Sequence, residues 1–343
     1  MKKLLNTLYV TTPEAYLALN GENVVVQKDG EELLRIPLHN LEGIVTFGYM
    51  GVSPRLMGAC AKRNVSLCFM SPNGRFLARV VGETQGNVLL RRQQYRIADN
   101  EVASCDIARN MIVGKLFNSR WVLQRATRDH PMRVNIERLD GACMHLQNAL
   151  KDARDSIDLE QLRGFEGKGA NAYFGVLDEL ILQQKEAFYF NGRSRRPPLD
   201  RFNALLSFFY ALLANDIASA LTTVGLDPYV GFLHRDRPGR VSLALDLMEE
   251  LRPVLADRLA ISLINRKELH ADDFTLRENG AVIMSDDTRK AVIAAWQSRK
   301  RETLTHPFLD EKIPWGLVPF VQAMLLARHL RGDLEEYPPL FWK

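Results

Sequence analysis

Hydrophobic and polar residues alternate along the chain from its start to about Val81. A period of two is typical of half-buried β-strands. It predicts seven short strands, at residues 7–10, 15–19, 24–27, 33–36, 44–47, 66–70 and 76–80. The dipeptides at 20–21, 29–30 and 73–74 are Asn-Gly or Asp-Gly hairpin signals, and Ser53-Pro54 begins one helix over 54–62. We therefore expect a β-rich domain over residues 1–81, small enough to need support from a partner surface.

The period changes to 3.6 after a candidate linker at 82–88. It indicates helices at residues 89–97, 104–127, 134–152, 170–184, 201–224, 242–252, 254–268, 286–303 and 315–331, with one short hairpin at 274–284. The most apolar helix, 201–224, contains Ser207, Asn215 and Asp216, which favours a core helix over a membrane span. Asn203 and Ser207 share one face of it and need hydrogen-bond partners. The pattern predicts an α+β protein, in which the small β-rich domain is followed by a larger all-α domain over 89–343.

An acidic cluster lies on the expected helix 242–252. Its apolar residues share one face, formed by Leu243, Ala244, Leu247, Met248 and Leu251. Asp246, Glu249 and Glu250 gather on the opposite side at i, i+3 and i, i+4 spacing, so all three carboxylates can reach one spot. Such carboxylates repel each other unless a cation lies between them, and carboxylate oxygens with one imidazole suit Mg²⁺ or Mn²⁺. The alternative is a solvated acidic face, as on most amphipathic helices.

One histidine precedes the acidic helix in a loop. Gly225 can end the long apolar helix, and residues 227–233 can form a short helical turn that delivers His234 at its end. Ser242 is the expected N-cap of the acidic helix. An imidazole so close to three carboxylates is a candidate metal ligand.

A glutamate flanked by glycines occurs earlier, in the sequence LRGFEGKGA at 162–170. A phosphate-binding loop is excluded because the G-x-x-x-x-G-K-[ST] spacing is absent and no strand precedes it. The glycines instead predict a sharp turn that brings Glu166 close to other elements. Glu166 would then open the helix 170–184, whose positive N-terminal end favours a carboxylate.

Clustered arginines occur in two loops. One, at 190–199, contains Arg193, Arg195 and Arg196, and the other, directly after His234, contains Arg235, Arg237 and Arg240. Both sets can follow the phosphates of DNA without reading its sequence. Ordinary surface exposure is the alternative for each of them.

Composition adds a few limits. The chain has 343 residues, of which 46% are hydrophobic and 25% charged, with a formal net charge of +4. This is ordinary for a globular protein and only mildly basic, so any affinity for nucleic acid depends on clustered arginines. The four cysteines have no zinc-ligand spacing and are expected to be buried thiols in a reducing cytosol. The start of the chain is too polar for a secretory signal, so we expect a soluble, cytoplasmic protein.

Three stretches carry a resemblance to a known family. They are LRGFEGKGANAYF at 162–174, RFNALLSFFYALL at 201–213, and GLDPYVGFLH with SLALDLMEELRP between 225 and 253. In wording, order and spacing the chain resembles the CRISPR-associated endonucleases that serve as the integrase of spacer acquisition. The resemblance extends over nearly the whole chain, since a β-rich start and a helical remainder are also that family's architecture. It implies a metal-dependent DNA endonuclease and transesterase that inserts short DNA fragments (spacers) into a CRISPR array through their 3′-hydroxyls.

The resemblance also implies a site and partners. In this family a glutamate, a histidine and a second acid bind a divalent ion, Mg²⁺ or Mn²⁺, and these map onto Glu166, His234 and Glu249. The second acid is commonly aspartate in relatives, so Asp246, one helical turn earlier, is an alternative or additional member. The implied partners are double-stranded DNA fragments, the CRISPR repeat, a second copy of the chain and a small ferredoxin-like companion subunit, with no membrane. We expect the dimer contact on the β-rich domain.

Two other functions fit some of the same residues. A DNA-binding scaffold with a degenerate metal site would bind DNA tightly in a salt-sensitive way without cleaving or joining strands. A metallohydrolase for small phosphoesters is disfavoured because the sequence has no H-E-x-x-H motif and no second histidine near the site.

Overall fold

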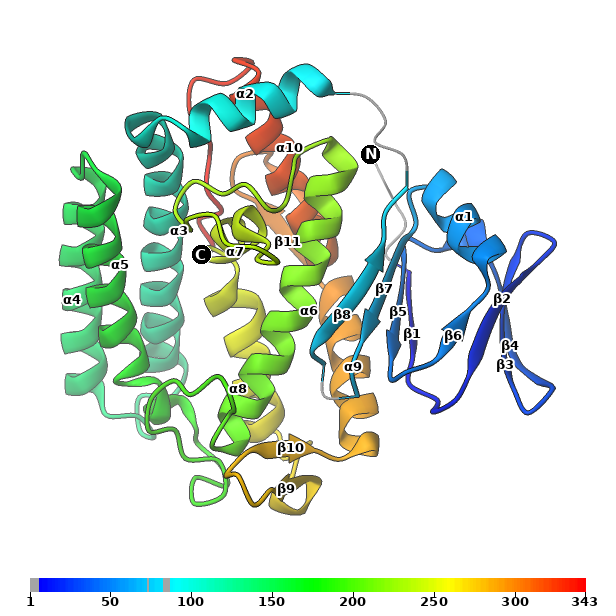
Figure 1. Cartoon of the computed structure of the whole chain (residues 1–343). Coiled ribbons are helices and arrows are strands. Elements are labelled where there is room, and N and C mark those ends of the chain that lie inside the picture. Colours follow the sequence, from blue (N-terminus) through cyan, green and yellow to red (C-terminus); the bar gives the residue numbers. More distant parts are fainter. Residues whose placement is uncertain (1–5, 73, 83–86) are drawn as a thin grey trace. The chain divides into compact units, whose positions relative to one another are not determined.

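The computed structural model describes residues 6–72, 74–82 and 87–343, and it divides the chain into two compact units. Unit 1 comprises residues 1–86 and 286–301, and unit 2 comprises residues 87–285 and 302–343. Strands come first and helices dominate afterwards, so the expected mixed α+β fold is confirmed in outline (Figure 1). The expected linker at 82–88 falls mostly on residues 83–86, which lie outside the described residues, as does Asn73 of one turn signal.

Unit 1 contains two four-stranded sheets. Its strands are β1 (Thr7–Val10), β2 (Tyr16–Asn20), β3 (Asn23–Lys28), β4 (Glu31–Pro37), β5 (Gly43–Phe47), β6 (Gly51–Val52), β7 (Ser66–Met70) and β8 (Phe76–Val80). One sheet has the order β1-β5-β7-β8, with only β8 antiparallel to its neighbour, and the other has the order β4-β3-β2-β6. All seven predicted strands are present. Strand β6 was not predicted, because two residues are too few to show an alternation of hydrophobic and polar positions.

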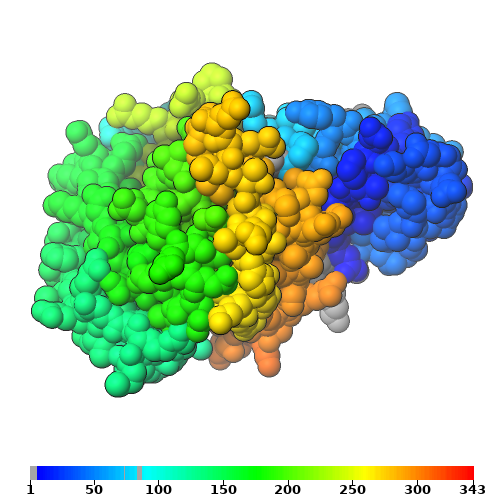
Figure 2. All heavy atoms as spheres, turned by 90° about the horizontal axis from the view of Figure 1, so that it is seen from below, coloured from blue at the N-terminus to red at the C-terminus, as the bar shows by residue number. Residues whose placement is uncertain are grey.

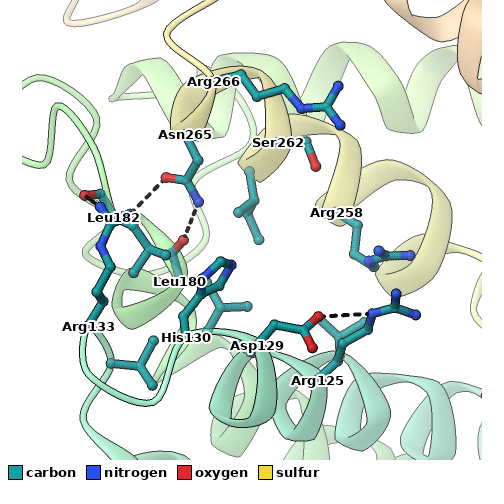
Figure 3. A pocket seen from close by; sticks show the side chains of 14 residues that line it. Arg125, Asp129, His130, Arg133, Leu180, Leu182, Arg258, Ser262, Asn265 and Arg266 are labelled. Atoms are coloured by element: carbon teal, nitrogen blue, oxygen red, sulfur yellow. Dashed lines mark hydrogen bonds and ion pairs between the residues drawn. The ribbon is translucent and has the colours of Figure 1, made fainter.

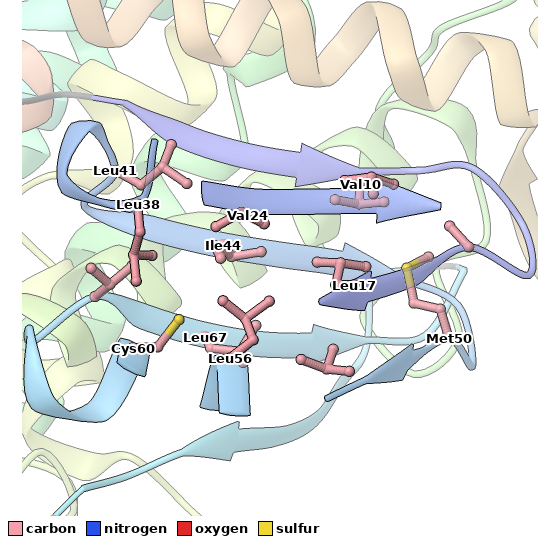
Figure 4. Close-up of a cluster of buried hydrophobic side chains, with 14 residues drawn as sticks. Val10, Leu17, Val24, Leu38, Leu41, Ile44, Met50, Leu56, Cys60 and Leu67 are labelled. Atoms are coloured by element: carbon pink, nitrogen blue, oxygen red, sulfur yellow. The ribbon is translucent and has the colours of Figure 1, made fainter. Parts of the chain in front are cut away.

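The core of unit 1 lies between these sheets and one helix, α1 (Pro54–Lys62). Figure 4 shows Leu17, Val24, Ile44 and Leu67 from four different strands pointing into one cluster. Ser53 caps α1 as expected, because its hydroxyl accepts a hydrogen bond from the Leu56 N–H at 3.2 Å. The alternating pattern of the sequence thus corresponds to the inward faces of two packed sheets.

Unit 1 is completed by a helix from much later in the chain, α9 (Asp286–Arg301). Its Gln297 amide donates to the Thr7 carbonyl at 2.8 Å, and its Arg289 side chain donates to the Pro72 carbonyl. The expected division placed this helix in the C-terminal domain, whereas the compact units place it with the strands. Periodicity predicts that a helix forms but carries no information about which unit it joins.

Unit 2 is mainly helical. Its helices are α2 (Val88–Ala98), α3 (Glu101–Asp129), α4 (Ile136–Arg154), α5 (Leu159–Phe174), α6 (Arg201–Val224), α7 (Ser242–Met248), α8 (Arg258–Asn265) and α10 (Val318–Leu330). A π-helical turn, η3 (Arg252–Asp257), joins the region after α7 to α8. The unit is not all-α, since it contains two hairpins. The hairpin of β9 (Phe274–Leu276) with β10 (Val282–Met284) was predicted at 274–284, whereas that of β11 (Thr303–His306) with β12 (Glu311–Pro314) was not.

The long apolar helix α6 is a core element. By length and composition alone it could span a membrane, but 67% of its most apolar window is buried inside the protein. Asp200 caps it through a 2.7 Å bond from the Asn203 N–H, and Gly225 ends it with a φ of +89°. The prediction of a buried helix over 201–224 is therefore confirmed.

The C-terminal tail after α10 is docked onto unit 2. Tyr337, Leu340 and Trp342 are all buried. The Phe341 ring packs 4.8 Å from the Phe117 ring of α3. The guanidinium of Arg258 lies over the Trp342 ring at 4.4 Å. These contacts show that the tail is docked and not frayed.

Candidate active site

Glu166 lies in the middle of α5. The predicted sharp turn and the predicted helix at 170–184 are both wrong, because α5 runs unbroken through the glycines and ends at Phe174. The glycines serve packing instead. A Cβ on Gly169 would overlap with Leu116 Cδ2, so this glycine lets α5 approach α3 closely. That approach brings Glu166 against the side chain of Lys115 on α3.

Lys115 joins two of the predicted site residues. Its ammonium contacts the Glu166 carboxylate and lies 2.8 Å from Glu249 Oε2. The side chains of Lys115 and Glu249 are 9% and 4% exposed, so this contact is nearly dry, whereas Glu166 is 27% exposed and faces outward. Burial alone would lower the pKa of Lys115, but the carboxylates of Glu249 and Glu166 outweigh it and raise this pKa. Two acids that are far apart in sequence therefore share one cation.

Glu249 is held ionised by its surroundings. Burial alone would raise the pKa of its carboxyl, but the positive charges of Arg252 and Lys115 lower it to about 2. Arg252 contributes from η3, with its guanidinium 3.1 Å from Glu249 Oε1. Oε2 is buried and accepts no hydrogen bond of normal geometry from the described residues, so its polar contact is the ion pair with Lys115.

Asp246 fixes the loop that carries His234. Its carboxylate accepts backbone N–H groups from Phe232, Leu233 and His234 at 2.6, 3.0 and 3.0 Å, and it lies 2.5 Å from His234 Nδ1. An ionised carboxylate in this position can only accept, so in the neutral imidazole Nδ1 carries the proton and Nε2 carries the lone pair. Nε2 has no polar partner among the residues described. A carboxylate that fixes the tautomer and the ring orientation of a histidine in this way is typical of metal sites, where the other ring nitrogen binds the ion.

The loop itself differs from the prediction. Residues 227–233 form irregular turns and not a short helix, and α7 has no side-chain cap from Ser242, which is its first residue. The four hydrogen bonds to Asp246 replace regular structure as the constraint on His234. Arg163 of α5 adds a further tie, since its guanidinium donates to the Leu233 carbonyl at 2.7 Å. Glu166 and His234 are therefore positioned by the same helix.

A first prediction concerns Gly231, at the start of this loop. A Cβ at this position would lie 2.7 Å from Asp246 Oδ2 and 2.9 Å from the Ser242 carbonyl carbon. Gly231→Ala must therefore displace either the carboxylate or the backbone, and we expect a loss of about 1–3 kcal/mol in the free energy of unfolding, measured by urea denaturation. Gly141→Ala on α4 is the matched control, because its Cβ meets nothing within 4 Å. An equal response of the two variants would contradict the packing described.

The three acids of the predicted cluster do not meet at one spot. Asp246 is engaged by the His234 loop, Glu249 by Lys115 and Arg252, and Glu250 points elsewhere. None of them forms a solvated face either, since all three are buried. The chain leaves regular helix at Glu249, so the expected helical spacing does not hold to Glu250.

Glu250 anchors the C-terminal tail. Its carboxylate accepts the hydroxyl of Tyr337, the N–H of Leu340 at 2.6 Å and the amide of Gln322 at 3.1 Å. Burial raises the pKa of this carboxyl to about 7. Asn118 of α3 completes the clamp, with its amide 2.7 Å from the Glu250 carbonyl and 2.8 Å from the Leu340 carbonyl. The tail is thus fastened to the residue that directly follows Glu249.

A second buried acid, Asp257, lies behind the site. Its carboxylate accepts the hydroxyls of Tyr210 at 2.7 Å and Tyr173 at 3.1 Å. The guanidiniums of Arg252 and Arg193 lie over the Tyr210 ring at 5.0 and 5.2 Å. Burial raises the pKa of Asp257 to about 6. This network connects the basic loop at 190–199 to the arginine that holds Glu249.

The raised pKa of Asp257 leads to a second prediction. An acid whose pKa is higher in the folded state stabilises the fold below its unfolded pKa, and this contribution is lost as pH rises through the folded value. Relative to Asp257→Asn, the natural chain should lose about 3 kcal/mol of unfolding free energy as pH rises from about 4 to about 6. Urea unfolding of both chains at several pH values measures the difference. Parallel pH profiles would contradict the assignment.

The arginines proposed for DNA fall into two groups. Arg195, Arg196, Arg235 and Arg237 are exposed. Arg193 donates to Asn203 at 2.7 Å and to Ser207 at 3.1 Å, so it supplies the partners that α6 was predicted to need. Arg240 closes its own loop through Ser242 and the Arg235 carbonyl. Phosphate contact fits the exposed four better than the two arginines that are engaged within the protein.

Three residues at the site went unrecognised in the sequence, Lys115, Arg163 and Arg252. Lys115 had a detectable signal, since it is a single lysine in the apolar run MIVGKLF at 111–117. A charge in such a run is rarely buried without a partner. Arg163 and Arg252 had no comparable signal, because both lie at positions where an exposed arginine is ordinary.

A separate polar cavity of about 370 Å³ lies where the C-terminal part of α3 meets α8. Figure 3 shows Arg125, Arg133, Arg258 and Arg266 around it. Asn265 closes one side of the cavity, because its side-chain amide donates to the Leu180 carbonyl at 2.8 Å and accepts from the Leu182 N–H at 2.7 Å. In Figure 2 the yellow surface of α8 lies beside the green surface of the segment that follows α5. The cavity contains none of the predicted site residues.

The proposed site offers oxygen and nitrogen donors to a divalent cation. Among residues 6–72, 74–82 and 87–343, no three His, Cys, Asp or Glu side chains are gathered closely enough to form a metal-ligand group as they stand. The carboxylates of Glu166 and Glu249 nevertheless converge on the buried ammonium of Lys115. The ring of His234 is oriented by Asp246, which leaves its Nε2 available to an ion. Oxygen and imidazole donors of this kind suit Mg²⁺ or Mn²⁺, so the chemistry of these residues fits such an ion.

A histidine oriented by one acid, with two further acids from separate parts of the chain, supplies the kinds of donor that bind a divalent ion in enzymes acting on phosphate esters. The family model "CRISPR associated protein Cas1" matches residues 8–298. The chain is 54% identical over 347 residues to a "CRISPR-associated endonuclease Cas1 2" from Rhodospirillum rubrum. It is 52% identical over 343 residues to a "CRISPR-associated endonuclease Cas1 1" from Chlorobaculum tepidum. Each of the two alignments covers 100% of both chains. The chain belongs to the Cas1 family.

Among solved structures, a "Casposase bound to integration product" shares the fold with a TM-score of 0.84 at 22% identity, covering 98% of this chain and 94% of that one. The resemblance inferred from the three sequence stretches is therefore confirmed, as is the prediction of an endonuclease-class enzyme. The assignment of roles to Glu166, His234, Glu249 and Asp246 stays a prediction.

Proposed function

We propose that this chain inserts short double-stranded DNA fragments into a CRISPR repeat by divalent-metal-dependent transesterification. The observation that carries the proposal is that Glu166 of α5 and Glu249, directly after α7, meet at one buried positive charge, while Asp246, three residues before Glu249, fixes the ring of His234. Glu166, Glu249 and His234 Nε2 would hold the ion. A bound Mg²⁺ or Mn²⁺ would supply Lewis-acid stabilisation of charge on the phosphate oxygens.

The remaining residues have distinct roles. Asp246 orients the imidazole and keeps its proton on Nδ1, so we place it behind the ligands as a positioning residue and not among them. Arg252 holds the second oxygen of Glu249 at 3.1 Å and thereby fixes the direction of that carboxylate. Arg195, Arg196, Arg235 and Arg237 are the proposed phosphate contacts, which suits fragments of varied sequence.

We further propose a homodimer, with its contact on unit 1. In the part of the chain that the structure describes, strand β4 lies at the edge of its sheet and pairs only with β3, and its Leu33 and Leu34 side chains are 49% and 40% exposed. An exposed apolar edge strand is a ready surface for pairing with a second copy. The family resemblance adds a small ferredoxin-like companion subunit and a cytoplasmic location. The four cysteines support a reducing compartment, since all are free and buried.

Strand joining tests the function directly. The full chain, with its companion subunit, is incubated with a labelled fragment bearing 3′-hydroxyl ends and a plasmid carrying one repeat, in Mn²⁺, in Mg²⁺ or in EDTA. We expect covalent transfer of the label to the plasmid only with a divalent ion. Tight, salt-sensitive DNA binding without any transfer would instead favour the scaffold with a degenerate site.

A further inference from the structure

The Lys115 ammonium occupies the point at which the carboxylates of the proposed metal site converge. Lys115 belongs to α3, and from there its side chain, which is 9% exposed, reaches both Glu166 of α5 and Glu249. We propose that Lys115 is an internal counter-ion that a divalent cation must displace, so that the site alternates between a lysine-filled and a metal-filled state. This inference rests on the proposed function, because it assumes that Glu166 and Glu249 are metal ligands.

Space alone prevents the two cations from sharing the site. Lys115 Nζ lies 2.8 Å from Glu249 Oε2 and contacts Glu166 as well. A divalent ion such as Mg²⁺ binds carboxylate oxygens at about 2.0–2.1 Å. An ion that bridged the same two oxygens would therefore overlap with the ammonium. Lys115 has to withdraw before both acids can coordinate an ion through these oxygens.

The charge balance leads to the same conclusion. The two carboxylates of Glu166 and Glu249 are matched by the two cations of Lys115 and Arg252. A divalent ion added to these four groups would bring their sum to two positive charges in a largely buried place, and the carboxylate of Asp246 behind His234 would offset only one of them. Such charges are strongly disfavoured away from water. The departure of one protein cation relieves part of this cost.

Lys115 is the cation that can leave. Arg252 is fixed by stacking on Tyr210 at 5.0 Å and by its own bond to Glu249 Oε1. Lys115 has no polar partner other than the two carboxylates among the described residues, and its ammonium sits at the end of a flexible four-carbon stem. Glu166, 27% exposed, marks the side open to solvent. The lysine thus protects the paired acids until the ion arrives.

Direct measurement of Mn²⁺ binding tests the proposal. Free Mn²⁺ is followed by its electron paramagnetic resonance signal during titration of the natural chain, of Lys115→Met and of Lys168→Met. Lys168, also a lysine, lies exposed on α5 over the Phe165 ring, so its loss controls for charge alone. We expect Lys115→Met to bind Mn²⁺ at least about tenfold more tightly and Lys168→Met to change by less than about twofold. Unchanged or weaker binding by Lys115→Met would overturn the proposal.

A second measurement uses the natural chain, in case Lys115→Met leaves its two acids too strained to fold. An amine-acetylating reagent is applied with and without saturating Mn²⁺, and acetylation at Lys115 is followed by mass spectrometry. We expect its rate to rise several-fold with Mn²⁺ while that of Lys168 stays constant. A constant or slower rate at Lys115 would show that the ammonium stays in place.

The double variant Glu166→Gln/Glu249→Gln separates this inference from the proposed function. If it binds Mn²⁺ as tightly as the natural chain, the metal site itself lies elsewhere and the proposed function fails with it. If it loses Mn²⁺ binding while Lys115→Met shows no gain, only the role of Lys115 is wrong.

Discussion

Glu166→Gln is expected to reduce metal-dependent strand joining by about 100-fold or more. The substitution keeps the shape of the side chain but removes the charge that a divalent ion needs, and such an ion contributes several kcal/mol of transition-state stabilisation. The fold should survive, because Glu166 is partly exposed and Lys115 keeps its contact with Glu249. Joining rates with saturating Mn²⁺, compared with thermal unfolding of the same preparation, give the result.

Glu160→Gln is the matched control for this variant. It makes the same chemical change on the same helix, at an exposed position in the first turn of α5. We expect a joining rate within about twofold of the natural chain. Should Glu166→Gln join strands as fast as this control, α5 would have no part in the chemistry and the proposed metal site would be refuted.

Truncation after Glu336 should cause the largest loss of stability. It removes three buried side chains, Tyr337, Leu340 and Trp342, and leaves Glu250 without two of its hydrogen-bond donors. Burial of each large side chain contributes about 1.5–3 kcal/mol, and an unsatisfied buried group costs about 1–3 kcal/mol. We expect the free energy of unfolding to fall by roughly 5 kcal/mol or more, which is much of the stability of an ordinary domain.

Urea denaturation measures this loss, and deletion of Lys343 alone is the control because this residue is exposed. The control should unfold at the same urea concentration as the natural chain. A truncated chain that unfolds there too would mean that the tail contributes nothing. Because Glu250 directly follows Glu249 in the chain, we also expect weaker Mn²⁺ binding once the tail no longer holds Glu250 in place.

The sequence predicted most of the elements of this fold because their signals are local. All seven expected strands and α1 follow from alternation and turn residues, and α6 follows from its Asp200 cap and its terminal Gly225. The errors arose where distant contacts decide the outcome. The return of α9 to unit 1 and the hairpin of β11 with β12 depend on tertiary pairing that no local pattern encodes.

The surroundings of the proposed site were predicted only in part, for a similar reason. The family resemblance assigned roles to Glu166, His234 and Glu249, and these roles stay predictions, but the glycine content suggested a turn where helix packing against Leu116 requires a small residue. Helical spacing placed three acids together, although the chain leaves regular helix at Glu249 and sends Glu250 to the tail. The role of Asp246 as the support of His234 becomes visible only when the loop's backbone N–H groups are seen to converge on it.

The membership of α9 in unit 1 has a consequence for biosynthesis. The ribosome makes the strands of this unit first and must then add residues 87–285 before α9 emerges. At about 5–20 residues per second this delay lasts roughly 10–40 s. During that interval the nascent sheets lack their last helix, so unit 1 reaches its final form only late in translation, after most of unit 2 has left the exit tunnel.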